Sequence, residues 1–263
     1  MDLGIAGKVA IVAAASSGLG KATALELAHE GARVAINSRN QQELRRVADE
    51  IHSTTGAEVL AVVGDVTDEA VVRRFVAETK TSFGSVDILV ANAGGPPAGF
   101  FDDFTAEHYR EAVELNLIST INLCREAVPH MRERGWGRVV AITSIAAKQP
   151  VENLILSNTA RAGVLGFMKS LSQQIAADGI TANTVCPGYH LTERLKSLAP
   201  LTAEKQGVAV EDVYAGWAAS TPMNRIGDPK EFAAVVAFLC SSRASYLTGA
   251  VIQVDGGAYR ALY

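Results

Sequence analysis

Short, continuously apolar segments alternate with longer helical patterns along almost the whole sequence. The segments are rich in valine, isoleucine and alanine and lack the polar alternation of a strand with one face in water. Strands covered on both faces by helices have this composition, which is typical of parallel sheets. The predicted strands are Lys8–Ala14, Arg33–Asn37, Glu58–Val63, Asp87–Ala91, Arg138–Thr143, Thr181–Val185 and Val251–Val254.

Helical patterns fill the intervals between these strands. Because strand and helix alternate with short loops, right-handed crossovers and a parallel sheet are favoured. The sequence therefore predicts an α/β protein with a doubly wound, seven-stranded parallel sheet, helices on both faces, and a single domain over residues 1–263. Helices are expected at Gly20–Glu30, Gln41–Thr54, Glu69–Ser82, Glu107–Arg134 and Asn158–Ala177.

One stretch, residues 193–228, departs from this rhythm. It follows the sixth predicted strand, begins with polar residues and contains Pro200, Gly207 and Pro222. Long excursions of this kind often cover a binding cleft. We expect a substrate lid here, and a helical surface insertion is the alternative.

Composition and charge exclude several classes of protein. A net charge of −4 gives no basic surface for a nucleic acid, and the apolar runs are too short to cross a bilayer. The N-terminus lacks the pattern of a signal peptide. Three cysteines, Cys124, Cys186 and Cys240, form no C-x-x-C motif and suggest a reducing, cytoplasmic setting. The five histidines lack ligand spacing, so we expect no catalytic metal.

A glycine-containing turn follows the first predicted strand and opens directly into a helix. Glycines let a backbone approach a pyrophosphate closely, and a helix N-terminus supplies N–H donors and a positive dipole end. Glycine after a strand is also common in ordinary turns, so the pattern alone is weak evidence. The candidate phosphate-binding residues are Ala14, Ser16, Ser17, Gly18, Leu19 and Gly20.

Features at the ends of other predicted strands strengthen this interpretation. The carboxyl ends of parallel strands meet at one edge of the sheet, where ligands of such folds bind. A carboxylate at Asp65 is placed to accept from an adenine amino group. Further candidate cofactor-binding residues at this edge are Val66, Asn92, Ala93, Gly94, Pro187, Gly188 and Thr192.

Through these motifs the chain resembles the short-chain dehydrogenase/reductase family, and within it the 3-oxoacyl-acyl-carrier-protein reductases. The resemblance covers essentially the whole length of the chain. The resemblance implies a Rossmann-like fold, a nicotinamide dinucleotide cofactor, and carbonyl reduction or alcohol oxidation. The family pattern Thr-Gly-x-x-x-Gly-x-Gly keeps Gly18 and Gly20 here, whereas Ala13 and Ala14 replace its first two residues. A methyl group at Ala14 restricts φ and crowds the turn.

Cofactor choice is decided at the end of the second predicted strand. An acid there holds the ribose 2′-hydroxyl of NAD, whereas this chain has Ser38 and Arg39. The guanidinium of Arg39 can pair with a 2′-phosphate. NADP(H) is therefore favoured over NAD(H); the alternative is a solvated arginine at a helix start.

The family resemblance implies four catalytic side chains, of which two match. Ser144 matches the serine that polarises the carbonyl, and Asn116 matches the asparagine that orders a water. Ser157 stands where the family has its proton-donating tyrosine, and Arg161 stands where it has lysine. A serine hydroxyl is far less acidic than a phenol, and losing a positioned acid costs ~10²–10⁴ in rate.

The two residues that directly follow Pro187-Gly188, Tyr189 and His190, are candidate replacement proton donors. Tyr189 and His190 belong to a loop that borders the nicotinamide in the family, and histidine has a suitable ordinary pKa near ~6.5. The alternative is that Tyr189 packs under the lid and that His190 faces solvent.

The resemblance also implies a homodimer or homotetramer built through the two long helices. Three functions remain open for a cleft that takes a small-molecule substrate or ligand. The first is NADP(H)-dependent carbonyl or alcohol chemistry, 3-oxoacyl reductase-like, with an altered catalytic set. The second is a catalytically silent relative that binds a dinucleotide or metabolite as a sensor or partner subunit. The third is a cleft that has lost the dinucleotide and holds another ligand.

Overall fold

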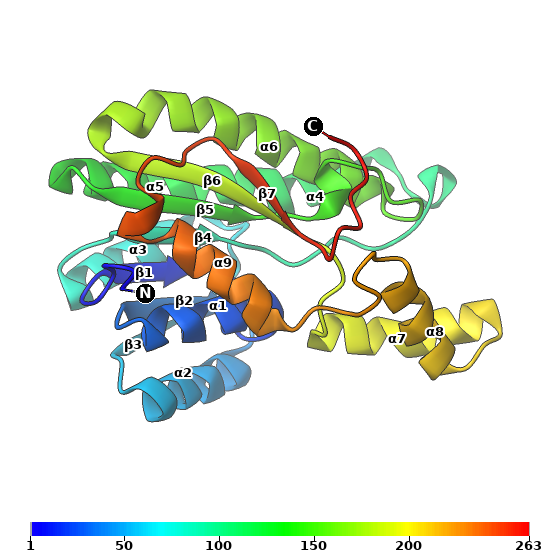
Figure 1. Ribbon diagram of the computed structural model, residues 1–263. Coiled ribbons are helices and arrows are strands. Elements are labelled where there is room, and N and C mark those ends of the chain that lie inside the picture. The colour runs from blue at the N-terminus through cyan, green and yellow to red at the C-terminus, as the bar shows by residue number, and fades with distance from the viewer. Residues whose placement is uncertain (1, 263) are drawn as a thin grey trace.

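The computed structural model describes residues 2–262 and contains a seven-stranded parallel sheet (Figure 1). The strands lie in the order β3-β2-β1-β4-β5-β6-β7, so the chain direction across the sheet reverses between β1 and β4. The predicted fold class is confirmed. The strands are β1 (Val9–Val12), β2 (Arg33–Ser38), β3 (Val59–Val63), β4 (Ile88–Ala91), β5 (Gly137–Ile142), β6 (Ile180–Pro187) and β7 (Val251–Val254).

Helices cover both faces of the sheet, as the continuously apolar strands require. Two separate apolar cores result, one on each face. On one face lie α1 (Gly18–His29), α2 (Gln41–Thr55) and α9 (Pro229–Leu239). On the other lie α3 (Glu69–Phe83), α5 (Ser119–Arg134) and α6 (Ile155–Ile175).

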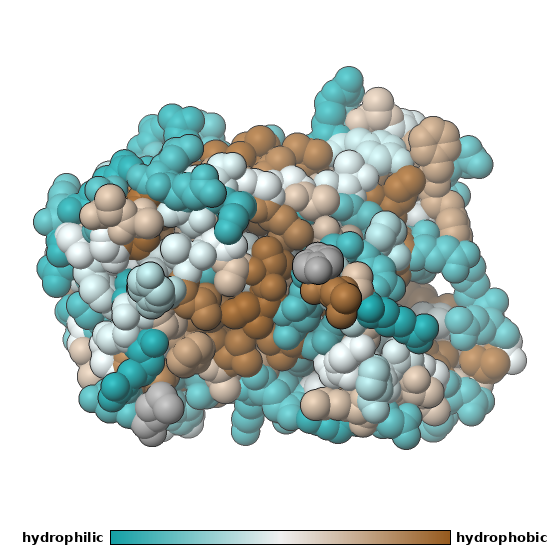
Figure 2. Space-filling view, turned by 45° about the horizontal axis from the view of Figure 1, so that its top comes forward, coloured by the Kyte–Doolittle hydropathy of each residue, from teal (hydrophilic) through white to brown (hydrophobic). Residues whose placement is uncertain are grey.

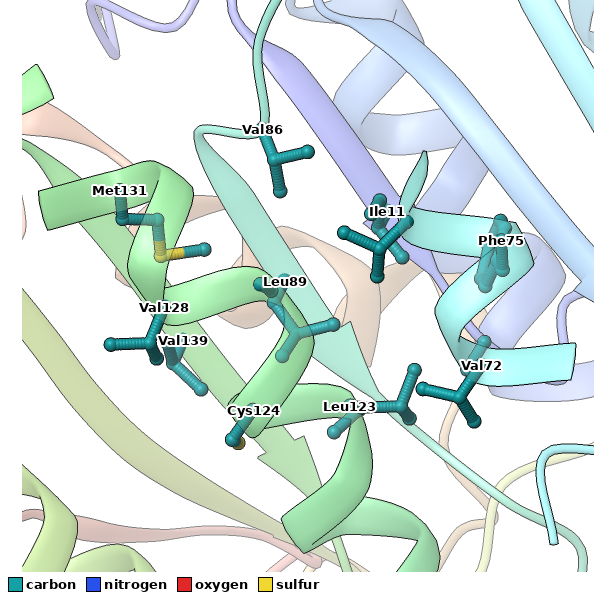
Figure 3. Close-up of a cluster of buried hydrophobic side chains, with 14 of the residues drawn as sticks. Ile11, Val72, Phe75, Val86, Leu89, Leu123, Cys124, Val128, Met131 and Val139 are labelled. Atoms are coloured by element: carbon teal, nitrogen blue, oxygen red, sulfur yellow. The ribbon is translucent and has the colours of Figure 1, made fainter. Parts of the chain in front are cut away.

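The second of these faces shows how alternate strand residues meet the helices (Figure 3). Ile11 of β1 and Leu89 of β4 point from the sheet toward Phe75 of α3 and Leu123 of α5. All four side chains are at most 1% exposed. Burying such a side chain stabilises the fold by about 1.5–3 kcal/mol, so this packing fixes the strand ends that form the site.

The helix boundaries follow local capping chemistry. The side chains of Asn40, Asp68 and Asp228 accept backbone N–H bonds at the starts of α2, α3 and α9. Gly56 and Gly84, in the left-handed conformation, end α2 and α3. These signals explain why the predicted and observed boundaries of α2 and α3 agree within one residue.

The long helix predicted at Glu107–Arg134 has an interruption that the sequence pattern did not show. The structure has α4 (Ala106–Val113), then a π-helical turn at Glu114–Ile118, then α5. The second long helix, α6, begins at Ile155 rather than Asn158, so Ser157 lies in its first turn. Short 3₁₀ turns occupy Phe101–Asp103, Ile145–Ala147, Ala176–Asp178 and Ser242–Ala244.

Two helices extend beyond the carboxyl ends of the strands, α7 (Glu193–Gln206) and α8 (Val210–Ala219) (Figure 1). They pack on each other through a small core of Ala199, Ala203 and Val213. These helices occupy most of the stretch predicted as a lid. Within residues 2–262, every helix is too short or too polar to cross a bilayer.

Candidate active site

A cleft of about 450 Å³ lies at the carboxyl ends of the strands, including the point between β1 and β4 where the chain direction reverses. Ligands of open α/β sheets bind at such switch points. The structure brings all the predicted cofactor-binding residues into the lining of this one cleft. They are Ala14, Ser16, Ser17, Gly18, Leu19, Gly20, Ser38, Arg39, Asp65, Val66, Asn92, Ala93, Gly94, Pro187, Gly188 and Thr192.

The turn before α1 carries backbone strain at Ala14. Its φ is +48°, in the left-handed region that glycine favours, and Gly18 has φ +57°. The side-chain amide of Asn92 donates to the carbonyls of Ala13 and Ala14, each at 3.3 Å, and so holds the turn. The methyl group of Ala14 therefore does not prevent the turn conformation, although alanine adopts it at a cost.

The start of α1 is open toward the cleft. Ser17 is the N-cap residue, but its side chain makes no capping hydrogen bond to the N–H groups of the first turn, which leaves them for a ligand. A Cβ at Gly20 would overlap the carbonyl oxygen of Ala14, so glycine is required for the helix to approach the turn this closely. The result is a helix N-terminus with a tight backbone turn beside it, which suits a phosphate group.

Arg39 and Asp65 form the charged pair at the far end of the cleft. Nη1 of Arg39 lies 3.5 Å from Oδ2 of Asp65, and the Arg39 side chain is 77% exposed. Oδ1 of Asp65 accepts from the N–H and the hydroxyl of Thr67, at 3.0 and 2.9 Å. Burial alone would raise the pKa of Asp65, but these bonds and Arg39 together hold it below its ordinary value. Asp65 is therefore an anion at neutral pH, and Arg39 keeps most of its donors available.

Two serine hydroxyls face the opposite end of the cleft. Ser144 follows β5, and its Oγ accepts from the N–H of Ala146 at 3.1 Å, which leaves the hydroxyl proton to donate elsewhere. Ser157 lies on α6, 7% exposed, and its hydroxyl bonds to no protein group among the described residues. Most helical serines satisfy the hydroxyl on a nearby carbonyl. The free hydroxyl of Ser157 is therefore available to a ligand.

Arg161 lies one helical turn after Ser157 and is almost completely buried. It donates from Nη1 to the carbonyls of Ile142 and Thr143, at 3.3 and 3.0 Å, and from Nη2 to the carbonyl of Gly94 at 3.3 Å. Burial, and after it the nearby charge of Arg194, lower the pKa of Arg161 to about 10, with Cys186 opposing the shift. The group still carries its proton at neutral pH. It is a fixed positive charge at the floor of the cleft.

Asn116 supports the site from behind the cleft wall. Its side-chain Nδ2 donates to the carbonyl of Gly94 at 2.9 Å, the same oxygen that Arg161 contacts. Its Oδ1 is buried without a hydrogen-bond partner among residues 2–262, which leaves an acceptor for an ordered water. The π-helical turn places Asn116 at this position.

Tyr189 does not reach the cleft. Its ring stacks on that of Trp217, with centroids 5.5 Å apart, and burial raises its pKa. His190 is also turned away: it packs edge-on against Phe232, and burial lowers its pKa. Both residues line a second hollow with Arg225. The prediction that Tyr189 stands near the nicotinamide as a proton donor is therefore not supported by its placement, because stacking on α8 directs the phenol elsewhere.

The cleft contains residues that the sequence reasoning missed. Arg194 of α7 lines it, with Nη2 at 3.4 Å from the carbonyl of Pro96. Apolar contributions come from Leu154, Leu198 and Ala98. The sequence did offer one signal: Arg194 lies two residues after the predicted Thr192, at the start of the expected lid.

Comparison with known proteins identifies the family. A family model described as enoyl-(acyl carrier protein) reductase matches residues 13–259. Dehydrogenase/reductase SDR family member 4 of Oryctolagus cuniculus is 35% identical over 258 residues, which is 97% of this chain and 94% of that protein. The chain belongs to the short-chain dehydrogenase/reductase family.

Other members of the short-chain dehydrogenase/reductase family agree with this assignment. The 3-oxoacyl-[acyl-carrier-protein] reductase FabG of Escherichia coli (strain K12) is 33% identical over 253 residues, covering 96% of this chain and 98% of that protein. The solved structure of L-sorbose reductase from Gluconobacter frateurii, complexed with NADPH and L-sorbose, has a TM-score of 0.96 at 34% identity and covers 100% of both chains. The chain is thus an oxidoreductase-type member of the family, similar to 3-oxoacyl reductases.

Proposed function

We propose that this chain reduces a carbonyl group with NADP(H), in the manner of a 3-oxoacyl reductase but with an altered catalytic set. The reaction is ketone plus NADPH plus a proton, giving alcohol plus NADP⁺. The observation that carries the proposal is one continuous cleft. It has an open helix N-terminus at one end, and Ser144, Ser157 and Arg161 at the other.

The residues present fit a dinucleotide phosphate. The uncapped start of α1 and the close approach at Gly20 form a backbone cradle for a pyrophosphate. The exposed guanidinium of Arg39 is placed for a 2′-phosphate, and β2 ends in Ser38 rather than in an acid. The related L-sorbose reductase binds NADPH, which also favours NADP(H) over NAD(H).

The proposed chemistry uses hydroxyls and a fixed cation in place of a phenol. NADPH, when bound, supplies the hydride. Ser144 donates its proton to the carbonyl oxygen, and the free hydroxyl of Ser157 offers a second donor. The buried cation of Arg161 stabilises the negative charge that develops on that oxygen. Since neither serine is acidic, the proton comes from solvent through one of these hydroxyls, with a rate penalty of ~10²–10⁴ relative to a positioned acid.

A second candidate function is a catalytically silent relative that binds a dinucleotide or metabolite as a sensor or partner subunit. The observation that favours it is the content of the cleft. Among the described residues, no tyrosine, histidine, lysine or cysteine lines it, and its one carboxylate, Asp65, lies at the Arg39 end.

A kinetic comparison of variants separates the two candidates. NADPH oxidation is followed by absorbance with methyl acetoacetate as the ketone, for the natural chain, Ser144→Ala and the double variant Ser157→Tyr with Arg161→Lys. The proposal expects measurable turnover that Ser144→Ala lowers by ~10²-fold and that the double variant raises. Thr159→Tyr, on the exposed side of α6, is the matched control for introducing a tyrosine. No turnover in the natural chain, with NADPH bound, would establish the silent relative instead.

The same proposal covers the assembly, the lid and the location. Residues 193–228 serve as the substrate lid of the single domain, since Arg194 and Leu198 of α7 line the cleft. Hydrophobic side chains gather in the middle of the face seen in Figure 2, which supports association of copies into a homodimer or homotetramer. Three free, buried thiols suit a cytoplasmic setting.

A further inference from the structure

The charges that line the cleft do not balance. Four side chains in its lining carry charge: Arg39, Asp65, Arg161 and Arg194. Arg39 and Asp65 face each other at one end. Neither Arg161 nor Arg194 has an ion-pair partner among residues 2–262, so two guanidinium groups remain without a counter-charge.

The two unpaired guanidinium groups lie beside the same short segment after β4. Arg161 donates to the carbonyl of Gly94, and Arg194 donates to the carbonyl of Pro96. The guanidinium of Arg194 also lies beside Gly95, where a Cβ would come within 3.3 Å of it. The charge of Arg194 contributes to lowering the pKa of Arg161, so the two like charges lie close enough to repel each other. A buried cation without a partner is costly, and an anion between the two would relieve that cost.

The anionic groups of the dinucleotide have other places to bind. The pyrophosphate cradle is at the start of α1, where Thr192 lies over Gly18: a Cβ at Gly18 would be 3.5 Å from the Thr192 methyl carbon. Arg39, at the far end of the cleft, is placed for the 2′-phosphate. Arg194 is two residues beyond Thr192 and contacts Gly95 and Pro96 instead. Arg161 and Arg194 are therefore at the end of the cleft where Ser144 and Ser157 lie and where we place the reaction.

We infer that the substrate is an oxo acid, whose free carboxylate binds between Arg161 and Arg194 while its ketone oxygen meets Ser144. This inference rests on the proposed reductase function and adds a substrate class to it. Arg194 is the specificity-determining residue, because it lies on α7 and its guanidinium makes only one long hydrogen bond to residues 2–262. Leu154, Leu198 and Ala98 provide an apolar wall for a short carbon chain.

A matched pair of substrates tests the inference. Acetoacetate and methyl acetoacetate carry the same ketone and differ in charge, and kcat/KM for each is measured with saturating NADPH. The natural chain should prefer the acid. Arg194→Met should lower the acid-to-ester ratio of kcat/KM by ~10–100-fold, the usual worth of a charge-assisted hydrogen bond. Arg194→Lys should restore part of the ratio. Lys205→Met removes a cation of the same helix outside the cleft lining and should leave the ratio unchanged.

Binding without turnover separates failure of this inference from failure of the reductase function. Acetoacetate is titrated by calorimetry into the chain holding NADP⁺, and into Arg194→Met under the same conditions. Weaker binding in the variant supports the carboxylate site even if no turnover is seen. Equal binding in both, a natural chain that prefers the ester, or a variant effect confined to KM for NADPH would overturn the inference. The last result would assign Arg194 to the cofactor phosphates.

Discussion

Replacing Ala14 with glycine should stabilise the protein, although it removes a side chain. Ala14 has φ +48°, and apart from Asn224 no other non-glycine residue described in the structure has a positive φ. An L-residue in the left-handed region costs about 1–2 kcal/mol relative to glycine. Two effects oppose the relief of this strain. Glycine raises the entropy of the unfolded chain, which costs about 0.4–1 kcal/mol, and the half-buried methyl group is lost, which costs part of the ~0.8 kcal/mol of one buried methyl group.

The neighbouring residue gives a control of opposite sign. Ala15 is completely buried and does not have a positive φ. Ala15→Gly therefore loses a buried methyl group and raises the entropy of the unfolded chain, with no backbone strain to relieve. The expected destabilisation is about 1–2 kcal/mol. Ala14→Gly should gain about 0–1 kcal/mol by the same terms. The two variants should differ by about 2 kcal/mol, or ~4–8 °C in melting temperature at ~2–4 °C per kcal/mol for a chain of this size.

Urea unfolding followed by circular dichroism, at one protein concentration, measures this difference. The midpoints should separate with Ala14→Gly the higher, and the slopes should agree, since both variants expose the same surface on unfolding. Equal destabilisation by the two substitutions would show that the turn is not strained at Ala14. The claim that Ala14 occupies a backbone position that favours glycine would then be wrong.

Three further outcomes are expected. Arg39→Gln should weaken NADPH binding by ~10-fold and leave NADH binding unchanged, because only the 2′-phosphate meets that guanidinium; equal loss for both cofactors in a fluorescence titration would contradict this. Gly20→Ala should destabilise the fold and abolish NADPH binding, because its Cβ would overlap the carbonyl of Ala14, whereas Gly166→Ala, with open space around it on α6, should not. Burial lowers the pKa of His190, so the unfolded chain binds its proton more readily and stability should fall as pH drops below ~6.5. His190→Gln should flatten that dependence in urea unfolding between pH 5 and 7.5, and an unchanged slope would contradict the shift.

Local chemistry made the sheet and the phosphate end of the cleft predictable. Apolar runs located the strands, capping residues set the ends of α2 and α3, and the glycine pattern at Gly18 and Gly20 located the turn before α1. Long-range contacts decided what the sequence could not show. The π-helical turn at Asn116 comes with a hydrogen bond to Gly94, and Tyr189 turns away from the cleft because Trp217 stacks on it. The role of Arg194 depends on where α7 begins relative to the loop after β4.

Calorimetric titration of the natural chain with NADPH and with NADH tests the central claim, that this cleft is a working NADP(H) site. We expect NADPH to bind with a dissociation constant at least ~10-fold below that of NADH, through Arg39. Absence of binding heat with either cofactor at millimolar concentration, or tighter binding of NADH, would contradict the account.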